Sequence, residues 1–248
     1  MRSERGIALI VTLLAMLLLS AIGAALVLAT GADTLIASNS GASSEAFYAA
    51  DAAFERAVAE LRTAPGFTAV LSGAVVSAFR DGVASGPRTL TDGSSVDLDV
   101  VLNEANCGSA ASCSASDMDR TTGDRPWGPR NPRWRLFSWG ALDAAAGGPT
   151  GGAPLFVAAM VADDPAEIDG DPWSDGGSPG PSVSPGAGIL WVRAEAFGRR
   201  GARRGVEGAV WRLDLSAQAR WELADPATRG PAPSSFPVLQ VIAWRERR

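Results

Sequence analysis

The sequence predicts an α+β protein in which one long N-terminal helix packs on an antiparallel β-sheet head. Three observations support this fold class. An apolar run without ionisable side chains extends from Gly6 to Gly31, a stripe of apolar residues at helical spacing follows it, and several strand-like segments occupy the rest of the chain. With 248 residues, 46% of them hydrophobic, the chain is long enough for this helix and one head domain.

The apolar run is long enough to cross a membrane. As a helix, residues 7–30 would measure about 36 Å, against about 30 Å for the hydrocarbon core of a bilayer. A secretory signal has an apolar region of only about 7–15 residues, although Thr30–Ala32 loosely resembles a cleavage site. Three interpretations follow: a cleaved signal, an ordinary anchor, or a helix that also serves in assembly. Arg2 and Arg5 place the N-terminus in the cytoplasm and the head outside.

The segment after the apolar run is predicted to continue as an amphipathic helix over residues 33–62. It contains no proline and one glycine, Gly41. Its large apolar residues recur every three or four positions, which places them on one face of a helix. This docking stripe consists of Phe47, Ala50, Phe54, Val58 and Leu61. The sequence Thr63–Gly66, which contains Pro65, should end the helix. The predicted organisation is therefore a helix over 7–62 and a head over 63–248.

The head is predicted to begin with a short helix within 67–79 and to continue as strands. Alternating apolar and acidic residues indicate a half-buried strand over 94–102. Further strands are predicted at 133–142 and 154–162, and a hairpin at 188–198 and 205–215 around an arginine-rich loop. The last strand, 237–247, is apolar on both sides, which indicates a central position in the sheet or a place under the helix.

The first 62 residues resemble the PilX-like minor pilins of type IV pili. The resemblance rests on a short charged leader, Gly6, the long apolar helix and the sequence AFYAADAAFERAVAEL, in which Phe47–Asp51 is the most specific part. It implies a pilin-like fold in which residues 1–6 are a leader. It also implies that a prepilin peptidase cuts between Gly6 and Ile7, and that the new N-terminus is methylated.

Two positions depart from the pattern of the major pilins. Major pilins usually begin the mature chain with phenylalanine and carry glutamate at its fifth position, where this chain has Ile7 and Val11. That glutamate is thought to pair with the N-terminal amine of a neighbouring subunit, and such a pair matters most where water is absent. Its replacement fits a minor pilin or pseudopilin at the tip or in the initiation complex of a type IV pilus or related secretion filament. The alternative is a single-pass, membrane-anchored periplasmic binding domain without a filament role.

The resemblance also implies partners and a location. The partners are other minor pilins and the major pilin, reached through the N-terminal helix, and the location is the bacterial inner membrane and the pilus. Nucleic acid is not expected as a partner, because a net charge of −5 gives no general electrostatic footprint for it. The arginine-rich segment 198–205 is interpreted as a solvated hairpin loop, with a DNA or lipid contact as the alternative.

Composition argues against an enzyme. The chain has no histidine and all of its basic residues are arginine, so it cannot contain a Ser-His-Asp triad, a zinc-binding HExxH helix or a Walker lysine. Two cysteines are too few for a four-cysteine metal site. Hydrolysis by paired carboxylates is compatible with the composition, but no spacing singles out such a pair.

The two cysteines, Cys107 and Cys113, are predicted to form a structural disulfide, because the head lies outside the cytoplasm. The alternative is a redox pair or a reactive thiol. Without histidine or lysine, only arginine or a helix end could activate a thiolate.

An acidic segment in the head is a candidate calcium site. Residues 163–175 contain six acids: Asp163, Asp164, Glu167, Asp169, Asp171 and Asp175. Calcium takes about 6–8 oxygen ligands in flexible geometry, and weak sites suffice outside the cytoplasm. The spacing does not fit an EF-hand. The alternative is an acidic loop kept in solvent by its charge.

Overall fold

The computed structural model describes residues 4–90, 92–142, 155–176, 188–213, 227 and 238–247. The chain divides into two compact units, Met1–Ala42 and Ser43–Arg248, which are described separately. The boundary falls inside helix α1, Glu4–Leu61. The second half of this helix therefore belongs to the same compact unit as the head.

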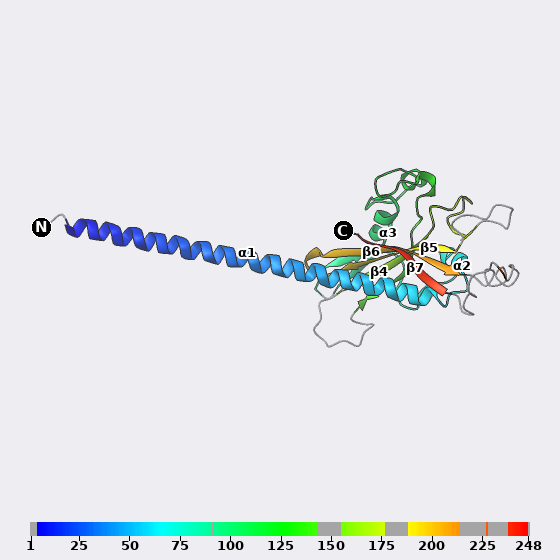
Figure 1. Cartoon of the computed structure of the whole chain (residues 1–248), viewed down its shortest axis with the longest axis horizontal. Helices are drawn as coiled ribbons and strands as arrows, with labels where there is room; N and C mark the ends of the chain where they lie inside the picture. The colour runs from blue at the N-terminus through cyan, green and yellow to red at the C-terminus, as the bar shows by residue number, and fades with distance from the viewer. Residues whose placement is uncertain are drawn as a thin grey trace. The chain divides into compact units, whose positions relative to one another are not determined.

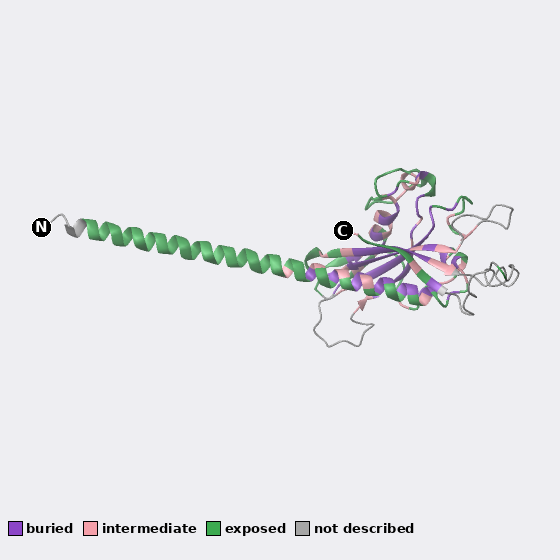
Figure 2. Cartoon of the chain, viewed as in Figure 1, coloured by how far each residue is buried: buried purple, intermediate pink, exposed green. Residues whose placement is uncertain are grey.

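The first unit is the apolar part of α1. Its large hydrophobic side chains are exposed, among them Ile7, Val11 and Leu28 (Figure 2). Ile7–Leu61 is, among the described residues, the one helix that is long and apolar enough to cross a membrane. Exposed apolar side chains around the whole circumference are what a helix surrounded by lipid or by other apolar helices requires.

The second half of α1 buries one face against the sheet. Ala50, Phe54, Val58 and Leu61 are at most 1% exposed and Phe47 is partly buried, whereas Tyr48 on the outer face is 69% exposed. Figure 2 shows buried and exposed residues alternating along this part of the helix. The helix ends at Leu61, where Thr63 and Ala64 donate backbone hydrogen bonds to Glu60 and Leu61. The predicted docking stripe is confirmed.

The head contains a five-stranded sheet in the order β3-β4-β5-β6-β7, with every neighbouring pair antiparallel. The strands are β3 (Arg135–Ala141), β4 (Phe156–Asp163), β5 (Ile189–Phe197), β6 (Arg203–Leu213) and β7 (Val238–Arg247). The 3-10 turn η2, Arg199–Gly201, joins β5 to β6. The strands predicted at 133–142 and 154–162 and the hairpin around the arginine-rich loop are confirmed.

The sheet has an apolar core on each face, and Figure 1 shows α1 and α3 (Leu98–Cys107) on opposite sides of it. On the α1 face, the buried residues of β5 alternate along the strand, as a pleated strand requires. They are Leu190, Val192, Ala194 and Ala196. On the other face, Leu98 and Val101 of α3 pack against residues of β3 and β4, including Leu136 and Met160. The sheet is therefore held between two helices.

The strand predicted over 94–102 is wrong for most of its length. Only β2, Ser95–Asp97, is a strand, paired with β1, Pro87–Thr89, and α3 follows at once. The Asp97 side chain accepts hydrogen bonds from the backbone N–H groups of Asp99 and Val100, which caps the helix. Leu98, Val101 and Ala105 then form a buried helical face. The alternation of apolar and acidic residues was compatible with the two-residue period of a strand and with the 3.6-residue period of a helix. The Asp97 cap decides in favour of the helix.

Two further predictions need correction. The helix predicted within 67–79 is present only as the short α2, Phe67–Leu71. Of the two places predicted for the last strand, the centre of the sheet is wrong, because β7 is at the edge of the described sheet. A place under the helix is confirmed, because Leu239 and Val241 pack in the core that α1 covers. Its Ile242 and Trp244 are about half exposed, and the Trp244 ring meets the Phe47 ring of α1 edge-on with centroids 6.3 Å apart. Apolar residues on both sides of β7 thus reflect contact with α1 on one side and exposure on the other. Two short elements, α4 (Ala115–Met118) and η1 (Gly128–Arg130), complete the described structure.

Candidate functional site

The predicted processing site lies at the beginning of α1. Gly6 and Ile7 fall in its first two turns, and the first three residues of the chain lie outside the described ones. The Ile7 and Val11 side chains are 60% and 58% exposed. Cleavage after Gly6 and methylation of Ile7 stay predictions, because the structure tests neither.

The two cysteines lie close together at the end of α3. Cys107 is the last residue of α3 and Cys113 follows a short loop, and in the structure their sulfur atoms are 2.05 Å apart in a disulfide. The disulfide closes this loop beside the cavity that contains Arg125 and Trp127. Its formation in the native protein stays a prediction that alkylation can test.

The arginine-rich loop is tied to neighbouring elements. Arg199 forms an ion pair with Glu45 of α1 at 3.4 Å, and Arg204 donates to the Ser43 hydroxyl at 2.7 Å. Arg203 binds the Glu195 carboxylate, with its Nε 2.7 Å from Oε2. The loop is an exposed hairpin connection between β5 and β6, as predicted, and three arginines of the segment 198–205 also link it to β5 and α1.

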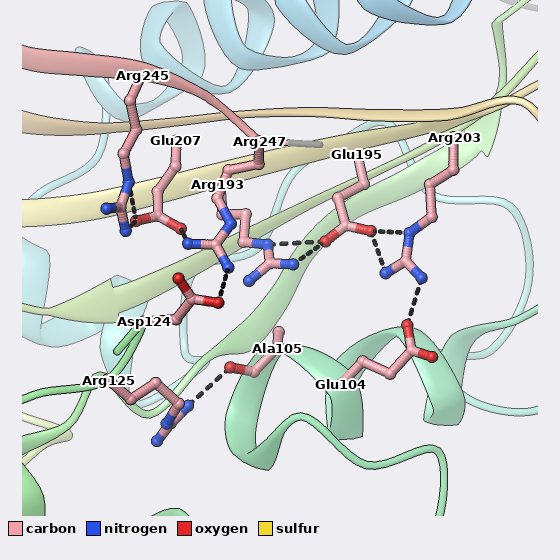
Figure 3. A network of polar contacts seen from close by, with 10 residues as sticks. All are labelled: Glu104, Ala105, Asp124, Arg125, Arg193, Glu195, Arg203, Glu207, Arg245 and Arg247. Atoms are coloured by element: carbon pink, nitrogen blue, oxygen red, sulfur yellow. Dashed lines mark hydrogen bonds and ion pairs between the residues drawn. The ribbon is translucent and has the colours of Figure 1, made fainter. Parts of the chain in front are cut away.

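A network of arginines and glutamates covers β5, β6 and β7 on the face away from α1 (Figure 3). The strand register places Arg193, Glu207 and Arg245 opposite one another across the three strands, so charges alternate along the row. Glu195 lies two residues after Arg193 and so points to the same face. Arg247, two residues after Arg245, completes this polar face.

The contacts in this network are short and shared. Glu195 accepts from Arg193 Nε at 2.7 Å and from Arg203 Nε at 2.7 Å, and Arg203 also contacts Glu104 of α3. Glu207 accepts from Arg245 Nε at 3.0 Å. Arg247 lies 3.7 Å from Glu207, so each glutamate is shared between two arginines.

The centre of the network is buried although it is charged, whereas Arg203 and Arg245 at its edges are exposed. Glu195 and Glu207 are each 2% exposed and Arg193 is 8% exposed. Arg125 donates to the carbonyl oxygens of Ala105 at 2.7 Å and Met118 at 2.9 Å, which anchors the α3–α4 region to this face. Burial, together with repulsion from Arg133 and Arg193, lowers the pKa of Arg125 to about 10. A cavity of about 220 Å³ opens between this network and Glu104.

This network was not predicted from the sequence. The signal was present in alternating sequences such as VRAEAF at 192–197 and WRER at 244–247. Alternation placed the charges on one face, but only the register of the hairpin shows that Arg193 and Glu207 are opposite partners. A buried ion pair of this kind is weak evidence for added stability, because the cost of desolvating both charges opposes their attraction.

The acidic segment 163–175 begins at the end of β4 and forms a cavity of about 50 Å³ with residues 129–133. Asp163, Glu167 and Asp169 come together in it, with one carboxylate oxygen of each within 4.8 Å of the others. Asp163 is fixed by the sheet register, opposite Leu190 of β5. A backbone hydrogen bond of 3.0 Å from Glu167 N to Asp164 O makes the turn that brings Glu167 back over Asp163.

The other three acids of the segment have different partners. The Asp164 carboxylate accepts from the backbone N of Ala166 at 3.1 Å and from the Trp191 indole at 3.3 Å. The Asp171 carboxylate accepts from Trp173 N at 3.1 Å. The Asp175 carboxylate accepts from Gly188 N at 2.7 Å and does not line the cavity. The predicted set of six acids is therefore divided: three converge, and three support the loop.

Two of the three converging carboxylates are buried with oxygens that lack a donor, whereas Asp169 is exposed and accepts from Asp171 N at 3.0 Å. Asp163 is 6% and Glu167 is 3% exposed, and Asp163 Oδ1 and both Glu167 carboxylate oxygens have no hydrogen-bond donor. Burial and the neighbouring Glu167 raise the pKa of Asp163 to about 9. Burial also raises the pKa of Glu167, with Asp175 and Asp169 adding repulsion. The site therefore favours a species that neutralises negative charge, either a proton or a cation.

Residues 5–55 match the PilX N-terminal family. The match covers the apolar part of α1 and most of the docking stripe, and it confirms the resemblance to PilX-like type IV pilins for this N-terminal region. No curated protein and no solved structure matches the chain.

Proposed function

We propose that the protein is a minor pilin, or a pseudopilin of a related secretion filament, at the tip or in the initiation complex. The observation that carries the proposal is the match of residues 5–55 to the PilX N-terminal family, on a helix apolar enough to cross a membrane. A single helix with exposed apolar side chains around its first half and a head docked on its second half has the layout of a filament subunit. This layout supports a pilus role over an isolated membrane anchor.

The residue at position 11 supports a minor role. Val11 is uncharged and exposed on the apolar part of α1, so it offers no carboxylate to the N-terminal amine of a neighbour. Inside an apolar filament core, an unpaired amine would lose the stabilisation that a glutamate supplies. A subunit with Val11 is therefore suited to a position where it is needed in few copies.

The proposal includes a processed and oriented subunit. A prepilin peptidase removes residues 1–6, Ile7 becomes the methylated N-terminus, and the head faces away from the cytoplasm. The partners are the major pilin and other minor pilins, which contact the apolar part of α1. The role is structural and not enzymatic, in keeping with a chain that has neither histidine nor lysine.

Deletion of the gene tests the function. Surface pili should be strongly reduced, while the major pilin still accumulates in the membrane, because an initiation subunit controls the start of assembly. The wild-type chain should restore the pili, and a chain carrying Gly6→Leu, which removes the processing site, should not. A pilus count unchanged by the deletion would contradict the proposal, as would abundance of this subunit in sheared pili close to that of the major pilin.

A further inference from the structure

We propose that Asp163, Glu167 and Asp169 form a calcium site that stabilises the head. The site is independent of the pilus function, because it rests on the geometry of the β4 end and the loop that follows it. The three carboxylates come from one segment, and the sheet fixes the first of them.

The separation of the carboxylates fits one ion. Calcium lies about 2.3–2.6 Å from each of its oxygen ligands, so two of its ligands can be at most about 4.6–5.2 Å apart. One oxygen from each of Asp163, Glu167 and Asp169 lies within 4.8 Å of the other two. The spacing of the three carboxylates is therefore compatible with one shared calcium ion.

Two of these side chains are buried with carboxylate oxygens that lack a donor, and a proton shared between them is the alternative to a cation. Glu167 is 3% exposed and neither of its carboxylate oxygens has a donor, and Asp163 Oδ1 is in the same situation. Nearby Arg133 pairs with Asp119 instead. Among the described residues, neither Arg130 nor Arg133 forms an ion pair with the three carboxylates. A buried carboxylate without a donor is costly, and a bound cation removes that cost.

The cavity and its donors select the type of cation. Its volume of about 50 Å³ leaves room for an ion and coordinating water. The ligands are all carboxylate oxygens, the chain has no histidine, and both cysteines are in the disulfide. Hard oxygen ligands favour calcium or magnesium over transition metals. Calcium tolerates irregular geometry better than magnesium, which requires a near-ideal octahedron.

Thermal unfolding of the full chain in detergent micelles, followed by tryptophan fluorescence, tests the site. The chain is first stripped with a chelator, and CaCl₂ or MgCl₂ is then added. At about ten times the Kd, calcium should raise the melting temperature of the head by about 3–6 °C. Magnesium should raise it by less. No shift with calcium, or an equal shift with magnesium, would overturn the proposal.

Two matched variants separate a bound ion from general charge screening. Glu167→Gln removes a ligand charge and should abolish the calcium shift, while leaving the stripped head at least as stable, because a buried charge is lost. Asp171→Asn removes one charge from the same loop, outside the converging set, and should keep the shift. A calcium shift that persists in Glu167→Gln, or one that Asp171→Asn abolishes equally, would contradict a site at these residues.

Discussion

The aromatic ring of Phe54 in α1 lies directly against the backbone of Gly208 in β6. A Cβ atom added at position 208 would lie 2.8 Å from Phe54 Cζ and 2.6 Å from the carbonyl oxygen of Ala243. Phe54 itself is fully buried. The absence of a side chain at position 208 thus lets the Phe54 ring of α1 pack against the backbone of β6.

Substitutions at this contact should destabilise the head. Gly208→Ala should lower the free energy of unfolding by about 1–3 kcal/mol through overpacking, and Phe54→Ala by about 3–5 kcal/mol through the cavity it leaves. Tyr48→Ala, on the exposed face of the same helix, is the control and should change it by less than about 0.5 kcal/mol. Denaturant unfolding of the full chain in micelles measures all three. Equal effects of Tyr48→Ala and Phe54→Ala would contradict the docking face.

The helix and its docking stripe could be predicted from sequence, because the spacing of Phe47, Phe54 and Leu61 fits only a helix over that length. The strands β3 to β6 were also predictable from short apolar runs between turns. The α3 segment was not, because its alternation suits a strand over a few residues and the deciding interaction is the Asp97 cap. The local sequence also could not show that β7 is an edge strand, because an edge position means that β7 pairs with β6 and with no other described strand.

The candidate sites were predictable only in part. Composition indicated an acidic segment, but the convergence of Asp163, Glu167 and Asp169 depends on a turn that the sequence does not specify. The partnership of Arg193 with Glu207 depends on strand register, which a single sequence leaves open. The position of charges along the chain could thus be predicted, and their partners could not.

The shared glutamate Glu195 should be important for stability. Glu195→Gln preserves the shape of the side chain but leaves Arg193 and Arg203 without their carboxylate, and breaking a buried pair in this way costs about 3–5 kcal/mol. The matched control is Glu45→Gln, which breaks the exposed pair with Arg199 and should cost at most about 1 kcal/mol. Urea midpoints compare the two, and similar midpoints would show that the network is not critical.

The disulfide should protect both cysteines. In the native protein, Cys107 and Cys113 should resist alkylation until a reductant is added, as mass spectrometry can show. Replacement of both by serine should lower the free energy of unfolding by about 2.4 kcal/mol, the chain-entropy estimate for so short a loop. Labelling of both thiols without reductant would count against the disulfide.

The acidic cavity should make the stability of the calcium-free head depend on pH. Burial raises the pKa of Asp163 to about 9 in the folded state, well above its ordinary value of 3.8. The stabilisation that the protonated Asp163 gives to the folded head is therefore complete below about pH 4. It is lost as the pH rises toward 9, because unfolding then releases a proton. With a chelator present, the melting temperature should fall between pH 5 and pH 8.

The variant Asp163→Asn is the control for this pH dependence. It has no proton to release at that position, so its melting temperature should fall less over the same range. The groups that face Asp163, including Glu167 and Asp169, are retained in it. A pH dependence as steep as that of the wild-type chain would show that Asp163 is not its source.

The intact mass of the chain, isolated from membranes and from sheared filaments, is the most direct test of whether this chain is a processed filament subunit. No arginine or lysine lies between Arg5 and Arg56, so tryptic peptides cover this region poorly and the whole chain must be weighed. We expect the mass of residues 7–248 plus one methyl group, less the two hydrogens of the disulfide. An intact Met1, or a chain beginning near Asp33, would contradict the claim.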